Sequence, residues 1–281
     1  EMRTCLVGSE MCIRDSYYTR PQFCKYHPNH SKRVIWFNRK SKGKSNKGMN
    51  DLMEVRNVSV SFDGFKAING LSWSIGYPEL RAIIGPNGAG KTTLMDIITG
   101  KTTADSGKVL WDQKVTILTQ KSEHQIAKLG IGRKFQRPTI FEEQSVEDNL
   151  MISLNNNRGF FSSLTYNYTN QEKLRVIEIA YTIKLSGLLS KKAGDLSHGQ
   201  KQWLEIGMLL SQDPKLLLID EPAAGMTTNE RNMTVQLLRN LSKTKSIIVV
   251  EHDMEFIRNL GCRVTVLHEG SVLAEGSIDH V

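Results

Sequence analysis

Cysteine and long apolar runs are scarce in this sequence. The chain has 281 residues but four cysteines, and three of these, Cys5, Cys12 and Cys24, fall near its start. A single cysteine in the remainder, Cys262, argues against a disulfide framework and favours a reducing, cytosolic compartment. No apolar run approaches the roughly 18 residues that a membrane-spanning helix needs. We therefore expect any role at a membrane to depend on a partner protein.

An excess of one charge is also lacking over most of the chain, although the formal net charge is +8. Residues 1–50 hold 11 Lys or Arg and 3 Asp or Glu, whereas residues 51–281 hold 26 basic and 26 acidic residues. Basicity is thus a property of the first segment and not a patch on the rest. A neutral body without a basic stripe disfavours binding to nucleic acid.

Residues 1–50 differ from the rest in composition as well. Residues 39–48 are polar, basic and low in complexity, which predicts disorder. Residues 5–16 resemble a translated sequencing-adapter remnant, so we expect the native chain to start at Met49 or Met53. We interpret the whole segment as a disordered basic tail, in part an artefact, and place no functional residue in it.

The clearest motif is G-x-x-x-x-G-K-T, which runs from Gly85 to Thr92. It stands between a β-branched run and a helix-like pattern, as a phosphate-binding loop does. Glycines let the backbone N–H groups surround phosphates, and the positive end of the following helix faces them. We expect Lys91 to reach the β- and γ-phosphates and the Thr92 hydroxyl to bind Mg²⁺. The predicted nucleotide-binding residues here are Gly85, Pro86, Asn87, Gly88, Ala89, Gly90, Lys91, Thr92 and Thr93.

A second candidate is an aliphatic run that ends in two carboxylates. Leu216–Ile219 predicts a buried strand of a parallel sheet, and Asp220 and Glu221 follow it. At the end of a central strand, Asp220 can lie beside a Mg²⁺ ion held by Thr92. Glu221 points in another direction and can polarise an attacking water. The alternative is a solvated acidic turn, which the upstream motif disfavours.

The segment L-S-H-G-Q, residues 196–200, precedes an amphipathic helix pattern. Ser197 is a good N-cap, and apolar residues between Trp203 and Leu210 supply one face. The plain interpretation is a capped helix. Small and polar residues at a helix N-terminus also form an anion site, and this one lies shortly before the acidic strand.

The order of the predicted elements indicates an α/β fold. Short strands with turns before residue 80 suggest a small antiparallel sheet. Between about residues 120 and 200 the pattern is mainly helical. From Leu216 onward strand-like and helical runs alternate, which predicts a mostly parallel sheet.

Five motifs in order resemble those of an ABC-transporter ATPase subunit. They are the phosphate loop, Gln136 within R-K-F-Q, L-S-H-G-Q, L-L-L-I-D-E, and His252 within V-E-H-D. The resemblance covers residues 51–281 and implies a P-loop NTPase (RecA-like) core with a mostly parallel sheet. It also implies an antiparallel β subdomain, an inserted α-helical subdomain at about residues 135–200, and hydrolysis of ATP with Mg²⁺.

The resemblance implies a role for each matching residue. Phe62 matches the aromatic residue that stacks on adenine, with Phe65 as a substitute. Gln136 matches the residue that senses Mg²⁺ and the γ-phosphate and couples the site to the membrane subunits. His252 matches the switch histidine that contacts the γ-phosphate. The implied catalytic residues are Glu221, His252, Gln136 and Lys91, and the implied metal ligands are Thr92, Gln136 and Asp220.

Residues 197–200 match the signature loop of the family, which contacts ATP bound to the opposite subunit, and residues 224–226 match a loop at the dimer interface. The signature residues are Ser197, His198, Gly199 and Gln200. His198 stands where the commonest signature has glycine. A phosphate loop and a signature loop separated by a helical insertion cannot contact one nucleotide within a compact monomer. Two subunits facing head to tail would complete each other's sites.

The sequences of residues 196–208 and 264–277 are similar to those of the ATP-binding subunits of urea importers, which are relatives of the branched-chain amino acid importers. This resemblance predicts the ATPase subunit of a urea importer, with a branched-chain or other polar amino acid importer as the alternative. A non-transport ABC ATPase is less favoured, because the chain has one ATPase unit and no sustained heptads. The implied partners are an identical or homologous ATPase subunit, two permeases and, indirectly, a periplasmic or extracellular solute-binding protein. The implied location is the cytoplasmic face of a bacterial plasma membrane.

Overall fold

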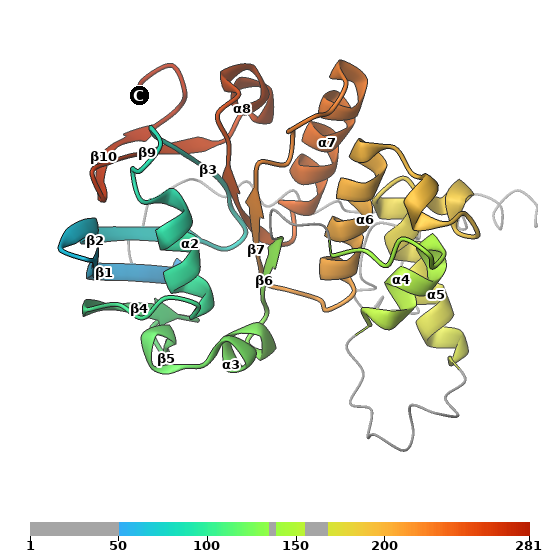
Figure 1. Ribbon diagram of the computed structural model, residues 1–281, viewed down its shortest axis with the longest axis horizontal. Coiled ribbons are helices and arrows are strands. Elements are labelled where there is room, and N and C mark those ends of the chain that lie inside the picture. Colours follow the sequence, from blue (N-terminus) through green and yellow to red (C-terminus); the bar gives the residue numbers. More distant parts are fainter. Residues whose placement is uncertain (1–50, 135–138, 155–167) are drawn as a thin grey trace, which may run out of the picture. The chain divides into compact units, whose positions relative to one another are not determined.

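The computed structural model describes residues 51–134, 139–154 and 168–281. Within these residues two β-sheets are flanked by helices (Figure 1). One sheet has four strands in the order β2-β1-β4-β5, and the other has six in the order β10-β9-β3-β8-β7-β6. No described helix combines the length and the apolar character that crossing a membrane requires. The predicted tail, residues 1–50, and Gln136 lie outside the described residues.

The four-stranded sheet is antiparallel throughout. Its strands are β1 (Asp51–Phe62), β2 (Phe65–Gly76), β4 (Ser106–Trp111) and β5 (Thr116–Ile117). The sequence predicts short strands where the single β2 runs. The strand continues because Gly70, with a φ of 58°, and register shifts against β1 absorb the turn-like sequence. The antiparallel sheet predicted before the phosphate loop is confirmed.

The six-stranded sheet is parallel except for its last strand, β10, which is antiparallel to β9. Its strands are β3 (Leu80–Ile84), β6 (Ile131–Lys134), β7 (Leu216–Asp220), β8 (Ser246–Val250), β9 (Arg263–His268) and β10 (Ser271–Gly276). The described part of residues 120–200 is mainly helical, as predicted, and β6 is an additional strand that the sequence did not predict. Four residues are too few to show a strand period, and β6 is a strand because it pairs with β7.

Both faces of the six-stranded sheet are covered, which explains the apolar runs of β7 and β8. Leu217 and Ile219 pack in one core with the helices beyond the sheet, whereas Leu216 and Leu218 pack in a second core with the four-stranded sheet. Successive side chains of a strand point to opposite faces, so a central strand is apolar at nearly every position. Burial of each such side chain stabilises the folded state by about 1.5–3 kcal/mol relative to leaving it exposed.

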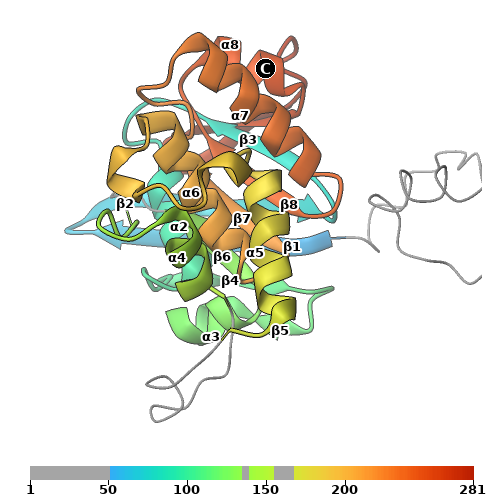
Figure 2. The ribbon, with the colours of Figure 1, turned by 90° about the vertical axis from the view of Figure 1, so that its right-hand side faces the viewer.

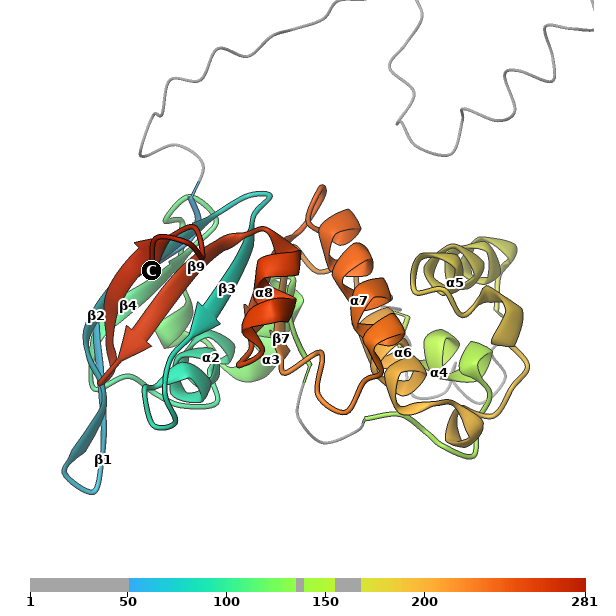
Figure 3. The same cartoon turned by 90° about the horizontal axis from the view of Figure 1, so that it is seen from above.

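The helices lie on both sides of the six-stranded sheet. They are α2 (Lys91–Thr99), α3 (Glu123–Lys128), α4 (Val146–Ile152), α5 (Asn170–Thr182), α6 (His198–Leu210), α7 (Thr228–Leu241) and α8 (Met254–Leu260). Figures 1 and 3 show α4, α5 and α6 on the side away from the four-stranded sheet. Seen from that side, α4 and α5 stand in front of β6 and β7 (Figure 2). The boundary of a helical subdomain at about residues 135–200 stays a prediction.

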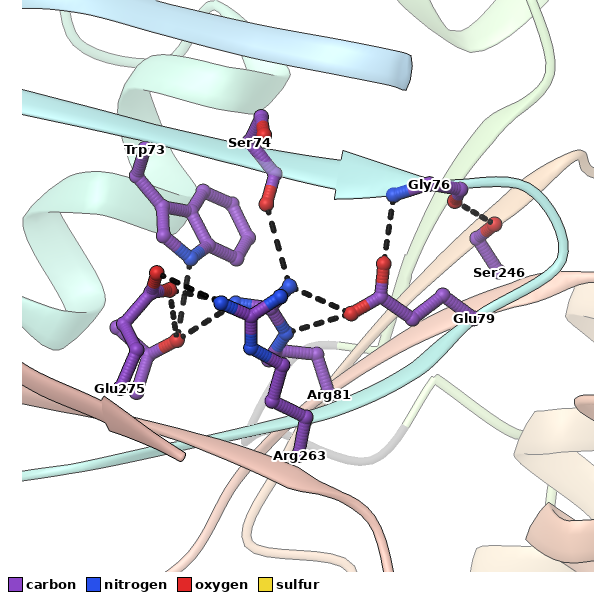
Figure 4. Close-up of polar contacts among 9 residues, drawn as sticks. Trp73, Ser74, Gly76, Glu79, Arg81, Ser246, Arg263 and Glu275 are labelled. Atoms are coloured by element: carbon purple, nitrogen blue, oxygen red, sulfur yellow. Dashed lines mark hydrogen bonds and ion pairs between the residues drawn. The ribbon is translucent and has the colours of Figure 1, made fainter. Parts of the chain in front are cut away.

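A network of polar side chains ties the two sheets together (Figure 4). Arg81 of β3 is 2% exposed and forms ion pairs with Glu79, at 2.5 Å, and with Glu275 of β10, at 2.6 Å. Its guanidinium carbon lies 5.5 Å from the ring centroid of Trp73 on β2. The Trp73 indole N–H donates to the Thr265 hydroxyl of β9 at 3.1 Å. Two carboxylates and an aromatic face thus compensate a buried cation.

Candidate nucleotide site

Close backbone contacts determine the path of the loop between β3 and α2. Gly85 has a φ of 153°, and a Cβ on it would lie 2.2 Å from the carbonyl oxygen of Leu267. Gly90, the N-cap of α2, has a φ of 97°, and a Cβ on it would lie 2.6 Å from the carbonyl oxygen of Ala67. Only glycine fits such contacts. The glycines of the motif are therefore required by β2 and β9, which flank the loop.

Lys91 opens α2 and turns back over the loop. Its Nζ donates to the carbonyl oxygens of Gly85, at 2.7 Å, and Pro86, at 2.9 Å. Burial lowers the pKa of this amine, and the carboxylates of Asp220 and Glu221 oppose that shift. The ammonium group thus lies beside the positive end of α2. This corner of the site is suited to an anion.

Two acidic residues and a histidine meet at the ends of β7 and β8. Asp220, the last residue of β7, is 4% exposed, and burial followed by the charge of Glu221 raises the pKa of its carboxyl. Glu221 has a φ of 49°, which turns the chain sharply, and its N–H donates to the carbonyl oxygen of Val250 at 2.9 Å. Its Oε1 lies 3.3 Å from the His252 Nε2. Adjacent parallel strands bring these residues, distant in sequence, to one edge of the sheet.

One cavity of about 400 Å³ collects most of the predicted site residues. It is lined by Phe62, Phe65, Ala67, Asn87, Gly88, Gly90, Lys91, Thr92, Thr93, Asp220, Glu221, Val250 and His252. Gly85, Pro86 and Ala89 belong to the same loop without lining the cavity. Ala67 and Val250 also line the cavity and were not predicted, because no motif distinguishes a strand residue that faces the cavity.

Oxygen donors suited to Mg²⁺ are present in this cavity. Thr92 offers a hydroxyl and Asp220 a carboxylate. Mg²⁺ is commonly held by one or two protein oxygens, several waters and the phosphates of a substrate, so this sparse set fits the ion. The third predicted ligand, Gln136, lies outside the described residues. No cluster of three or more His, Cys, Asp or Glu that could hold a metal occurs in the described part of the chain.

The residues of L-S-H-G-Q lie apart from this cavity, at the start of α6. Ser197 is the N-cap, and its hydroxyl accepts a hydrogen bond from the Gln200 N–H at 3.2 Å. His198 Nε2 lies 3.1 Å from the carbonyl oxygen of Ala224. Gly199 is buried, and a Cβ on it would lie 2.6 Å from the carboxyl carbon of Glu230. None of the four residues 197–200 lines the cavity that contains Lys91.

Comparison with known proteins decides the family. The ABC transporter family model matches residues 68–224. The chain belongs to the ABC transporter family. As an ABC transporter ATPase it binds ATP and hydrolyses it in a transport system, and the predicted cassette fold and enzyme class are confirmed.

Relatives of this ABC ATPase point to one branch of the family. The "Probable branched-chain amino acid transport ATP-binding protein LivG" of Methanocaldococcus jannaschii is 35% identical over 237 residues, covering 81% of this chain and 91% of the relative. The "High-affinity branched-chain amino acid transport ATP-binding protein LivG" of Escherichia coli K12 is 32% identical over 241 residues, covering 82% and 93%. An ABC transporter cassette solved in its ADP conformation is 31% identical, with a TM-score of 0.72 over 83% of this chain and 95% of that one. Urea specificity is not confirmed by these relatives.

Proposed function

We propose that this ATPase subunit energises an importer of branched-chain or related amino acids. The observation that carries this proposal is the similarity, over 81% or more of the chain, to ATP-binding proteins named for branched-chain amino acid transport. Urea import is the second candidate, favoured by the resemblance of the sequence of residues 196–208 to that of urea-importer ATPases. We assign two permeases and a solute-binding protein as further partners, and the cytoplasmic face of the membrane as the place of action.

We assign the nucleotide to the cavity between Phe62 and His252. Phe62 stacks on the adenine, and the loop N–H groups with Lys91 hold the phosphates. Thr92, Asp220 and Gln136 would hold Mg²⁺, which would stabilise negative charge on the phosphate oxygens. The carbonyl groups that now accept from Lys91 are replaced by phosphate oxygens, which are stronger acceptors because they are charged.

The proposed hydrolysis uses the close pair at the end of β7 and β8. The Glu221 carboxylate aligns the attacking water with the γ-phosphorus and accepts its proton as the water oxygen bonds to phosphorus. The bond from the γ-phosphorus to the β,γ-bridging oxygen breaks, and ADP and phosphate leave. His252, whose Nε2 lies 3.3 Å from that carboxylate, contacts the γ-phosphate. Lys91 balances the charge that builds on the transferred group.

We further propose a head-to-tail dimer of ATPase subunits. Ser197 caps a helix of 13 residues outside the cavity of its own chain, and Ser197 and His198 are exposed. A second subunit facing the first would place this positive helix end against the γ-phosphate of the first subunit's ATP. ATP binding would then favour the dimer, and hydrolysis would release it.

The Glu221→Gln variant tests the catalytic and dimer proposals together. Hydrolysis should slow on the order of 10²–10⁴-fold, the effect of losing a general base, while ATP still binds. ATP-bound dimers should therefore accumulate, measured by size-exclusion chromatography with light scattering. Glu178→Gln, which changes an exposed carboxylate of α5, is the matched control and should behave as the parent. Full turnover by Glu221→Gln would show that another group activates the water.

Uptake by the reconstituted transporter tests the solute. The ATPase is combined with its permeases and binding protein in liposomes that contain ATP, and labelled leucine and urea are offered in separate assays. We expect ATP-dependent uptake of leucine, lost with Glu221→Gln. Uptake of urea without uptake of leucine would overturn the amino acid assignment and support the second candidate.

A further inference from the structure

A buried carboxylate joins the two loops that carry Glu221 and His252. Glu251 follows β8 directly and is 4% exposed. Its Oε1 accepts a hydrogen bond from the Ala223 N–H at 2.8 Å, and its Oε2 accepts one from the His252 N–H at 2.9 Å. The Asp253 N–H donates to the same Oε2 at 3.4 Å. Each oxygen of Glu251 therefore serves a different loop.

These hydrogen bonds hold the backbone on both sides of the reacting pair. Ala223 lies two residues after Glu221, and the N–H of Glu221 donates to the carbonyl oxygen of Val250 on β8. The loop after β7 is thus tied to the end of β8 at two points. A shift of either loop would change the 3.3 Å distance between Glu221 Oε1 and His252 Nε2.

Only a carboxylate satisfies this arrangement of donors. Backbone N–H groups approach both oxygens, so both must be acceptors. A glutamine would turn an NH₂ group toward one of these N–H donors and lose the hydrogen bonds of that loop. An apolar residue would leave buried N–H groups without partners on both sides, which is costly. The backbone N–H groups of the two loops thus compensate for the burial of the Glu251 carboxylate.

We propose that Glu251 is a positioning residue for ATP hydrolysis. It holds the loop of Glu221 and the loop of His252 in the register at which both side chains act on one γ-phosphate and its attacking water. Glu251 does not line the cavity, so it acts through these two residues. The inference rests on the proposed function, which assigns the roles of Glu221 and His252.

The Glu251→Gln variant tests the proposal by separating turnover from binding. We expect kcat to fall about 10- to 100-fold, the cost of misplacing reacting groups by about 1 Å, with KM for ATP within about twofold of the parent. Glu275→Gln is the control for lost stability, because it alters a carboxylate of the Arg81 network away from the cavity. The control should lower the melting temperature and leave kcat unchanged. Should Glu251→Gln not fold, Glu251→Asp keeps both oxygens on a shorter stem and should show the same split.

A combined variant distinguishes action through Glu221 and His252 from a separate effect. If Glu251 acts through these two residues, adding Glu251→Gln to the variant that carries both Glu221→Gln and His252→Ala should change ATP hydrolysis by less than about threefold, because residues that act as a unit are not additive. Losses that multiply, an unchanged kcat in Glu251→Gln, or a raised KM with unchanged kcat would overturn this inference alone. Full turnover by Glu221→Gln would overturn the proposed function and this inference with it.

Discussion

Lys91 and Asp220 carry opposite charges in one cavity, and burial disfavours the charged form of each. It lowers the pKa of Lys91 and raises the pKa of Asp220. The cavity thus holds charges that cost stability until a counter-ion arrives, as functional sites commonly do. In the proposed complex, a nucleoside triphosphate with Mg²⁺ would bring an anion to Lys91 and a cation to Asp220.

We expect Asp220→Asn to stabilise the nucleotide-free protein. The pKa of Asp220 is raised in the folded chain despite opposition from Arg133, Lys134 and Lys91, so above that pKa the ionised carboxylate reduces the free energy of unfolding. Replacing it should raise the melting temperature at neutral pH by about 2–4 °C, the shift that about 1 kcal/mol gives in a domain of this size. The gain should shrink as the pH falls through the raised pKa of the folded state, and it should vanish below the ordinary pKa of 3.8, where the carboxyl is protonated in both states.

Differential scanning fluorimetry with and without ATP and Mg²⁺ measures this effect. The parent should gain stability on adding the magnesium nucleotide, and Asp220→Asn should gain less because it lacks one proposed ligand. A lower melting temperature for the nucleotide-free variant would contradict the electrostatic account.

Single residues differ in how far the sequence predicts their role. Motif spacing, and the rule that parallel strands end at one edge of the sheet, predict that one site contains Lys91, Asp220 and Glu221. Neither predicts a role for Glu251, although that residue stands beside His252. Its burial and its bond to the Ala223 N–H depend on β7 and β8 being neighbours, which no local pattern reveals.

Helix α6 shows the same limit for a whole element. Ser197 as N-cap and the apolar face were predicted, and both are present. Glu205 within that face is 6% exposed, pairs with Lys134 of β6 at 3.2 Å and accepts from the Thr139 N–H at 2.9 Å. No pattern in the sequence predicts β6, so nothing indicated a partner for this charge. A short edge strand is recognisable only after its neighbour in the sheet is known.

The pair of Lys134 and Glu205 predicts a large, non-additive effect on stability. Glu205→Leu leaves Lys134 charged and buried, which should reduce the free energy of unfolding by about 3–5 kcal/mol. Adding Lys134→Met removes the unpaired charge and should restore most of that loss. Urea unfolding of the parent, both single variants and the double variant gives the coupling energy. Equal, additive losses would show that the two side chains do not depend on each other.

Over the whole chain, the order of strands and helices predicted an α/β fold with a small antiparallel sheet, and the resemblance of five motifs to ABC-transporter ATPases implied the cassette fold. The sequence could not predict how the sheets are joined. Trp73 and Arg81 come from consecutive strands, whereas Glu275 lies 194 residues after Arg81, and each alone has the pattern of an ordinary strand residue (Figure 4). The sequence also could not show what the exposed Ser197 and His198 face. Within the described residues they do not line the cavity of the phosphate loop, and this separation is the reason for proposing a second subunit.

The phosphate loop rests on residues that come after every recognised motif. The Gly270 N–H donates to the carbonyl oxygen of Ala89 at 3.2 Å, and Gly85 lies against Leu267. The family match ends at residue 224, and the last motif histidine is residue 252. A chain shortened to end after the last motif would keep every motif residue. It would lose the β9 and β10 residues that contact the phosphate loop and determine its path. The part of the chain needed for an intact phosphate loop therefore extends to the hairpin of β9 and β10 and does not end with the motifs.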